Sequence, residues 1–195
     1  MLATKLANAT GDGPNERGLS RRRAFEAVEA SLRRLGTDRI DILYLHREDA
    51  TTPLEETVLA IADLIRQGKI CYVGVSNWAA WQIAKALGIA ERLNLARFES
   101  LQAHYTVAGR DLERELIPML KSEGMGLMVW SPLAGGLLSG KYDRTQSPPA
   151  ETRFGRHQFS NTMYWNDAAF DSIGQLHEVA DELGISMATL ALAWV

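Results

Sequence analysis

The segment WSPLAGGLLSGKY (residues 130–142) contains Gly135, four further residues, and then Gly140 followed directly by Lys141. This spacing is similar to that of a P-loop, whose backbone N–H groups and lysine bind nucleotide phosphates. A P-loop also needs Ser or Thr after the lysine to hold Mg²⁺, and Tyr142 occupies that position. The next residues, DRTQSPPAETRF, have paired prolines and no apolar periodicity, so no helix is expected to begin there. The sequence therefore disfavours an ATPase and indicates a strand that ends in a turn of small residues.

Residues able to do chemistry end each of five short apolar segments, which read LATK, IDILYLH, ICYVGV, FESLQ and GLMVW. They are Lys5, His46, Ser76 with Asn77, Gln102, and Trp130 with Ser131. Taken singly, each has a structural explanation: a lysine at a strand end, a half-buried histidine, a helix cap, a buried amide or a core tryptophan. Because ligands bind at the carboxyl ends of parallel strands, the residues taken together predict one binding site.

The elements that must position these residues form a repeated unit of strand and helix. The apolar segments recur at intervals of roughly thirty residues, which is typical of strand–helix units. Gly36 can end the first helix in a left-handed conformation, and Pro118 is expected to separate two short helical pieces. The candidate N-cap residues are Ser20, Thr52, Asn77 and Asn166.

This alternation predicts an α/β fold with parallel strands, and two architectures compete for it. One is a (β/α)8 barrel of the TIM type, and the other is an open doubly wound sheet. The open dinucleotide-binding sheet should show G-x-G-x-x-G after a strand, and Gly11, Gly13 and Gly18 lack that spacing. The barrel is therefore favoured.

Composition excludes several classes of function. With 195 residues, of which 46% are hydrophobic and 23% charged, the chain is expected to form one soluble globular domain. A net charge of −3 gives no general attraction to nucleic acid or to a membrane, and Arg21, Arg22 and Arg23 are interpreted as a solvated helix start. Cys71 is the only cysteine, so a cytoplasmic setting without a disulfide or a metal centre is expected. No segment has the pattern of a signal peptide or a bilayer span.

Motifs along nearly the entire chain resemble the aldo-keto reductase family, a set of NADPH-preferring (β/α)8 carbonyl reductases. These motifs are ATK (3–5), SLRRLGTDRIDILYLH (31–46), GKICYVGVSNW (68–78), LQAHY (101–105) and WSPLAGGLLSGKY (130–142). They are most similar to the branch that contains bacterial general-stress reductases and potassium-channel β-subunits. The resemblance implies NADPH/NADP as cofactor and a small carbonyl compound as substrate.

The resemblance also implies roles for individual residues. Lys5 would lower the pKa of a catalytic tyrosine, and His46 would orient the carbonyl group. The nicotinamide would stack on Trp130, with its carboxamide bound by Ser76, Asn77 and Gln102, since an amide-rich set suits a primary carboxamide. The residues implied to line the phosphates are Ser131, Pro132, Leu133, Gly135, Lys141 and, in a following loop, Arg153. Lys141 and Arg153 could instead simply be solvated.

The catalytic Asp and Tyr of the family are not assigned in this sequence. Both would belong to a strand and loop before Met1, and Tyr44 lacks the required context. The strand count predicts a single incomplete domain over residues 1–195, with about five of the eight strand–helix units and without the first two strands and the last. A truncated product, an incomplete gene model and an excised fragment are the alternatives. We therefore expect little reductase activity, and a noncatalytic NADP-binding regulatory subunit or an inactive fragment is the alternative function.

The carbonyl substrate is not specified by the sequence. Residues 143–165 are rich in large side chains that either close over the pocket or pack the loop against the barrel, and packing against the barrel is favoured. These side chains are Phe154, Phe159, Met163, Tyr164 and Trp165.

Overall fold

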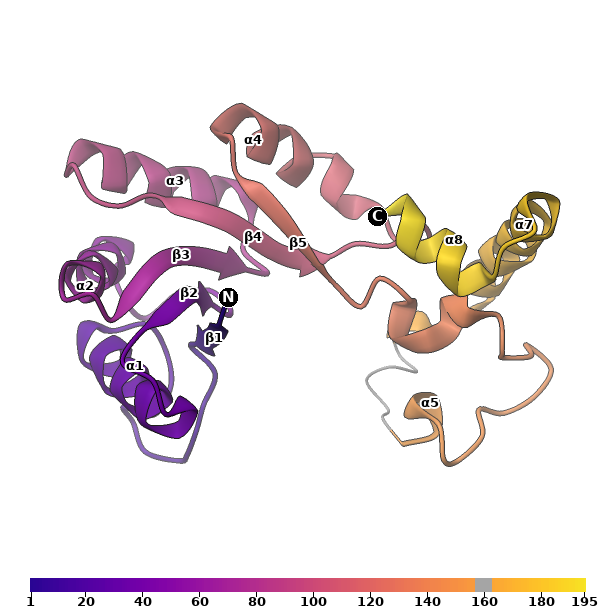
Figure 1. The fold of residues 1–195 in the computed structure, drawn as a ribbon, viewed down its shortest axis with the longest axis horizontal. Coiled ribbons are helices and arrows are strands. Elements are labelled where there is room, and N and C mark those ends of the chain that lie inside the picture. The colour runs from indigo at the N-terminus through magenta and orange to yellow at the C-terminus, as the bar shows by residue number, and fades with distance from the viewer. Residues whose placement is uncertain (157–162) are drawn as a thin grey trace. The chain divides into compact units, whose positions relative to one another are not determined.

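The computed structural model describes residues 1–156 and 163–195, and strands alternate with helices along much of the chain (Figure 1). The strands are β1 (Ala3–Leu6), β2 (Ile40–Leu45), β3 (Ile70–Ser76), β4 (Phe98–His104) and β5 (Gly126–Trp130). The helices are α1 (Arg21–Leu35), α2 (Leu54–Arg66), α3 (Ala80–Arg92), α4 (Leu116–Glu123), α5 (Arg153–Arg156), α7 (Asp167–Leu183) and α8 (Met187–Trp194), with 3-10 turns η1 (Asp111–Glu113) and η2 (Ala134–Ser139). Each apolar segment predicted to be a strand is a strand.

The contacts within the chain divide it into two compact units. The first unit comprises Met1–Ala103 and Glu113–Met128, and the second comprises His104–Leu112 and Val129–Val195. The chain passes between them near the ends of β4 and β5. The two units are described separately below.

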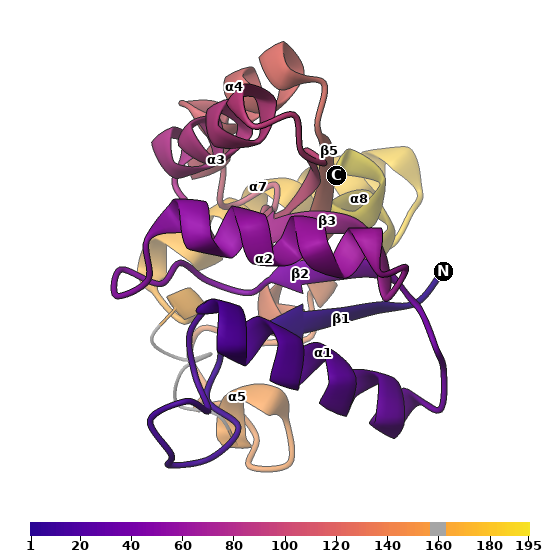
Figure 2. The same cartoon turned by 90° about the vertical axis from the view of Figure 1, so that its left-hand side faces the viewer.

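The first unit contains a sheet in which the strands follow their order in the sequence, from β1 at one edge to β4 and then β5. Parallel pairing joins β1 to β2, β2 to β3 and β3 to β4. Helices α1 and α2 lie side by side against these strands, and α3 packs next to α2 (Figures 1 and 2). This arrangement confirms the predicted α/β class, because parallel strands need helical crossovers that return the chain to the same edge.

Tyr44, Gly74 and Ser100 occupy one row across β2, β3 and β4. The Tyr44 side chain crosses over Gly74, and its hydroxyl forms a 2.9 Å hydrogen bond with Ser100 Oγ. A Cβ atom at Gly74 would lie 2.5 Å from Tyr44 Cε1 and 2.9 Å from the backbone oxygen of Ser100. Gly74 is therefore required by the close approach of the buried tyrosine ring rather than by a turn.

The ends of α1 are those that the sequence predicts. Ser20 Oγ accepts a 3.3 Å hydrogen bond from the N–H of Arg23, and Gly36 has a left-handed φ of 65°. The interpretation of Arg21, Arg22 and Arg23 as one solvated cluster is wrong for Arg23, which is only 7% exposed. Successive helical residues are rotated by about 100°, so Arg23 faces the interior while Arg21 and Arg22 remain exposed.

Three other boundary predictions are wrong. Pro53, not Thr52, is the N-cap of α2, and the Thr52 hydroxyl donates to Asp49 Oδ2 at 2.7 Å. Ala79, not Asn77, precedes α3. Pro118 does not separate two helical pieces but lies in the first turn of α4, where its missing N–H costs no intrahelical hydrogen bond.

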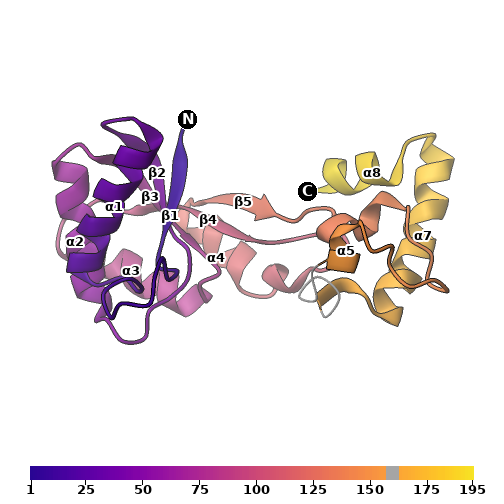
Figure 3. The ribbon, with the colours of Figure 1, turned by 90° about the horizontal axis from the view of Figure 1, so that it is seen from below.

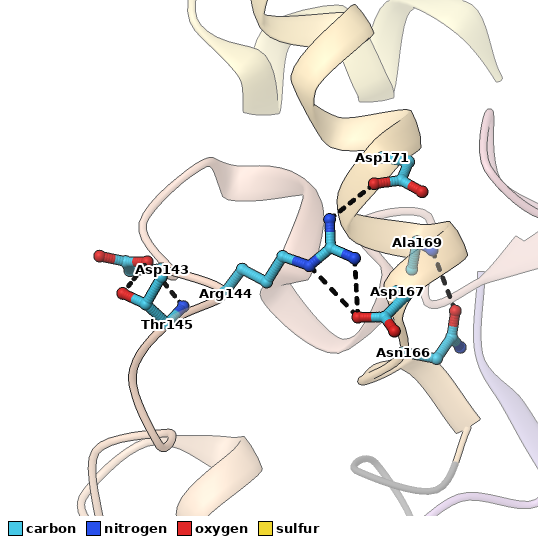
Figure 4. Close-up of polar contacts among 7 residues, drawn as sticks. All are labelled: Asp143, Arg144, Thr145, Asn166, Asp167, Ala169 and Asp171. Carbon is cyan, nitrogen blue, oxygen red and sulfur yellow. Dashed lines mark hydrogen bonds and ion pairs between the residues drawn. The ribbon is translucent and has the colours of Figure 1, made fainter.

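The second unit is built around η2, α7 and α8 (Figure 3). Asn166 caps α7 as predicted, with its Oδ1 accepting a 2.9 Å hydrogen bond from the N–H of Ala169. The exposed guanidinium of Arg144 bridges Asp167 and Asp171 on the first turns of this helix at 2.8 and 2.7 Å (Figure 4). Carboxylates near a helix N-terminus also interact favourably with the helix dipole, so both effects stabilise the start of α7.

The large side chains of residues 143–165 that the structure describes pack inside this second unit, and their expected packing against the barrel stays a prediction. Phe154 is fully buried and Tyr164 is 7% exposed, while Met163 and Trp165 pack against the same cluster. Phe154 contacts the rings of Tyr164 and Trp165. Phe159 lies outside the described residues.

Among the described residues, no helix has both the length and the apolar character that crossing a bilayer requires.

Candidate functional site

The predicted residues of the first unit lie at the carboxyl ends of adjacent parallel strands. Lys5 is on β1 and pairs in register with Tyr44, and His46 follows β2 directly. The backbone N–H of His46 donates a 2.8 Å hydrogen bond to the carbonyl of Leu6, which extends the strand pairing by one residue. On the next strands, Ser76 pairs in register with Gln102. The ends of β1 to β4 therefore lie side by side within the first unit, whereas Trp130 and Ser131 belong to the second unit.

Asn77 connects the strand ends to one another. Its side-chain amide donates to the carbonyl of His46 at 3.2 Å and to Ser76 Oγ at 3.0 Å. Its backbone N–H donates to the carbonyl of Gln102 at 3.2 Å, and its φ of 58° is left-handed. Asn tolerates this conformation better than most residues. The side-chain amide of Asn77 thus links the ends of β2 and β3, and its backbone N–H links them to β4.

The imidazole of His46 contacts an asparagine that sequence analysis missed. Asn8 Nδ2 lies 3.0 Å from His46 Nδ1, so Asn8 donates to that nitrogen when the proton of the neutral ring is on Nε2. Burial lowers the pKa of His46, and the positive charges of Lys5 and Arg47 lower it further. The neutral imidazole is therefore favoured near pH 7, and its Nε2–H can donate to a carbonyl oxygen.

The side-chain amide of Gln102 has a weak hydrogen-bond acceptor, which a ligand can replace. Its Nε2 lies 3.2 Å from the sulfur of Met128, which is a weak hydrogen-bond acceptor. A ligand oxygen could take this donor at little cost. Together with the buried hydroxyl of Ser76 and the amide of Asn77, Gln102 offers both donors and acceptors, and this set fits a primary carboxamide.

In the second unit, the ring of Trp130 at the end of β5 lies beside that of His104, a residue to which sequence analysis gave no role in the site. The rings of Trp130 and His104 are 4.8 Å apart, and those of His104 and Tyr164 are 5.4 Å apart. Burial lowers the pKa of His104, against a smaller opposing effect of Asp111. His104 and Tyr164 come from segments distant from Trp130 in sequence, so only the folded unit reveals this aromatic cluster.

The turn after Trp130 has a backbone dominated by left-handed residues. Ser131, Ala134, Gly135, Gly136 and Gly140 all have positive φ. Such backbone can form concave anion sites, but the N–H groups of Ala134 and Gly136 already donate to the carbonyls of Ser131 and Leu133. Only part of this turn is therefore available to bind phosphate through its backbone.

Pro132 and Leu133 are half-buried within this turn, and the two predicted phosphate-binding cations of the second unit are exposed. Lys141 Nζ lies 5.1 Å from the centre of the Tyr142 ring, a cation–π contact that leaves the ammonium accessible. Arg153 was expected in a loop, but it begins the single-turn helix α5. After Gly140 the chain forms turns and bends rather than a helix, in agreement with the argument against a P-loop.

A sequence profile described as "Aldo/keto reductase family" matches residues 1–195. The chain belongs to the aldo/keto reductase family. Its parallel strands and alternating helices are consistent with an incomplete (β/α)8 barrel of that family, in which active-site residues lie at the carboxyl ends of the strands.

Individual relatives in the aldo/keto reductase family have two kinds of name. A "Probable voltage-gated potassium channel subunit beta" of Arabidopsis thaliana is 42% identical over 197 residues, covering 100% of this chain and 60% of the relative. "Aldo-keto reductase dtxS3" of Metarhizium robertsii is 40% identical over 98% of this chain and 51% of the relative. "Versiconal hemiacetal acetate reductase" of Aspergillus parasiticus is 39% identical over 94% and 53%. The chain thus spans about half to three fifths of the length of these relatives.

Proposed function

We propose that the chain provides part of an NADP(H)-dependent oxidoreductase site that reduces aldehydes or ketones to alcohols. The observation that carries the proposal is the hydrogen-bonded group formed by His46, Ser76, Asn77 and Gln102 at neighbouring strand ends. Family membership and the reductases among the relatives support the same reaction class. The single free cysteine, Cys71, is compatible with the proposed cytoplasmic setting.

In this proposal the first unit holds the reacting end of the ligands. Ser76, Asn77 and Gln102 bind the nicotinamide carboxamide, and His46 donates to the carbonyl oxygen of the substrate. Lys5 supplies a positive charge close to the proton donor. When bound, NADPH supplies the hydride. The neutral state of His46 suits its role, because a neutral imidazole orients a carbonyl through Nε2–H without giving up its proton.

Further roles are proposed from the sequence pattern for residues that lie in the second unit. Trp130 offers an aromatic face to the nicotinamide. The phosphates are assigned to the residues of the following turn and to two exposed cations, namely Ser131, Pro132, Leu133, Gly135, Lys141 and Arg153. The basis of these assignments is the sequence pattern together with the accessible ammonium of Lys141.

We further propose that the polypeptide of these 195 residues turns over slowly. No tyrosine within it is assigned as the proton donor, and general acid catalysis typically contributes about 10²–10⁴-fold. Binding and turnover are therefore tested separately. NADPH binding is followed by the change in its fluorescence, and turnover by NADPH oxidation with a reactive aldehyde.

The variant Gln102→Ala tests the carboxamide site, with Gln67→Ala as the matched control because Gln67 is exposed just after α2. We expect NADPH affinity to fall about tenfold in Gln102→Ala and to remain unchanged in the control. Equal affinities in the two variants, or no saturable binding by the unmodified chain, would contradict the proposed cofactor site. Rapid turnover by the unmodified chain would contradict the proposed impairment.

A noncatalytic NADP-binding subunit is the second candidate, favoured by the similarity to proteins named as potassium channel β-subunits. This candidate shares the cofactor site and differs in its output. It predicts NADPH binding with no turnover on any reactive aldehyde and a stable complex with a partner protein. Measurable turnover that Gln102→Ala abolishes would favour the reductase instead.

A further inference from the structure

A small cavity of about 110 Å³ lies in the first unit beside β1 and α1. Its polar lining comes from both elements, from the loop after β1 and from the end of β2. The lining residues that matter here are Lys5, Thr10, Arg23, Ser31, Arg34 and His46. Since one water takes about 30 Å³ of liquid volume, the cavity has room for an ion of a few heavy atoms but not for a nucleotide.

Arg23 is the buried charge of this cavity. It is only 7% exposed, and its Nη2 donates a 3.1 Å hydrogen bond to Thr10 Oγ1. Its Nε is buried and has no hydrogen-bond partner among the described residues. An unpaired buried donor on a charged group is costly, because the group has lost water without gaining an acceptor. The Nε–H of Arg23 is thus a buried donor without an acceptor among the described residues.

The other charged groups that line the cavity are also cationic. Lys5 and Arg34 contribute positive charges, and His46 adds a titratable imidazole. No aspartate or glutamate is among the lining residues. Arg34 Nη2 donates to Ser31 Oγ at 3.3 Å, so its contact inside the cavity is neutral as well. The positive charge here is not balanced by a carboxylate in the lining.

The two preceding arginines of α1 each form an ion pair with a carboxylate. Arg22 forms a 2.8 Å ion pair with Glu26, and Arg21 forms a 2.5 Å ion pair with Asp63. Both are exposed to solvent. Arg23, which is buried, instead donates to the hydroxyl of Thr10. Arg23 therefore differs from its two neighbours in having no ion pair with a carboxylate among the described residues.

We propose that this cavity binds a small oxyanion of the phosphate type, either as the free ion or as the terminal group of a larger ligand. Arg23 would donate through Nε, with Lys5 and Arg34 providing further charge-assisted hydrogen bonds. The cavity shares Lys5 and His46 with the proposed reductase site, whereas Thr10, Arg23, Ser31 and Arg34 have no role in that site. An anion bound here would also stabilise the protonated form of His46 and so raise its pKa.

Inorganic phosphate is the probe that tests the proposal, titrated into the 195-residue chain by calorimetry at constant ionic strength maintained with sodium chloride. We expect saturable binding by the unmodified chain, and a fall in affinity of at least about tenfold in Arg23→Gln. Arg22→Gln is the matched control, since it removes the same charge from the exposed face of the same helical turn. Phenyl phosphate in a second titration separates a free ion from a terminal phosphate group, and binding of either supports the site.

A second variant and a second measurement guard against a folding defect in Arg23→Gln. Arg34→Gln changes an exposed side chain of the cavity and should also weaken phosphate binding. NMR of the His46 imidazole should show a rise in its pKa when phosphate is added to the unmodified chain. The proposal is overturned if neither phosphate nor phenyl phosphate binds saturably, or if Arg22→Gln and Arg34→Gln have equal affinities.

Discussion

The strongest local test of the fold concerns Asp49 in the loop after β2. Its carboxylate accepts hydrogen bonds from the N–H of Leu19 at 2.7 Å, from the N–H and hydroxyl of Thr51 at 2.9 and 2.6 Å, and from the hydroxyl of Thr52 at 2.7 Å. Thus Asp49 ties the loop before α1 to the loop before α2. In Asp49→Asn one acceptor oxygen is replaced by an NH₂ group, which faces donors instead of accepting from them.

The expected loss in the free energy of unfolding follows from the pKa of the Asp49 carboxyl group. Burial acts to raise the pKa of Asp49, but the hydrogen bonds from Thr51, Thr52 and Leu19 outweigh it and lower the pKa from 3.8 to about 2. This difference corresponds to about 2.4 kcal/mol in the free energy of unfolding. Because Asp49 is partly exposed, solvent screening reduces the expected contribution to about 1 kcal/mol.

Because the pKa of Asp49 is lowered in the folded state, its contribution to stability decreases as the pH falls. A carboxyl whose pKa is lower in the folded state stabilises the fold fully above about pH 4, and this contribution is lost as the pH falls toward 2. The stability difference between the unmodified chain and Asp49→Asn should therefore be about 1 kcal/mol at pH 7 and should shrink between pH 4 and pH 2.

Native-state hydrogen exchange in β2 and α1 measures this difference within the first unit, where Asp49 lies. Glu48→Gln is the matched control, because it removes the neighbouring acidic charge from an exposed side chain. If the two variants lose equal protection, or if the Asp49→Asn difference is independent of pH down to pH 2, the hydrogen bonds of Asp49 do not stabilise the loop as inferred.

Further predictions concern the packing of each unit and the electrostatics of the strand ends. Gly74→Ala should destabilise the first unit by about 1–3 kcal/mol in urea unfolding, because its Cβ would contact the Tyr44 ring; an unchanged midpoint would contradict this account. Tyr44→Phe should cost only about 0.5–1.5 kcal/mol in the same assay, since it removes one hydrogen bond and keeps the ring. Phe154→Ala should cost about 3–5 kcal/mol and reduce amide protection in α7, and normal protection there would refute its central place in that core. Lys5→Met should raise the pKa of His46 in an NMR titration, and a lower pKa would reverse the inferred charge effect.

The strands were predictable because each is a short apolar segment that ends in a polar residue. The burial of several apolar side chains together stabilises such a strand, so one polar residue within the segment does not prevent the strand from forming. The cap at Ser20 and the left-handed stop at Gly36 were predictable for a related reason, since both depend on contacts within a few residues.

The failed predictions involve residues whose partners are distant in sequence or whose context changes the local preference. The Thr52 side chain is oriented toward Asp49, to which it donates, and Asp49 is itself held by the N–H of Leu19 from a different loop. Asn77 gives its side-chain amide to the carbonyl of His46, thirty-one residues earlier. The contact of Asn8 with His46 was missed in the same way. The secondary-structure propensity of a residue reflects its local conformational preferences, and it does not include hydrogen bonds to residues distant in sequence.

The three consecutive arginines of α1 show how position, rather than residue type, separates a solvated charge from a candidate site. Their side chains have identical chemistry, but the helix turns each by about 100° from the last. Arg21 and Arg22 meet carboxylates at the surface, whereas Arg23 enters the interior beside a cavity with a cationic lining. A sequence that reads as one basic cluster therefore encodes two environments. The buried guanidinium is retained at a cost in desolvation, and a bound oxyanion would offset that cost by supplying the missing acceptor.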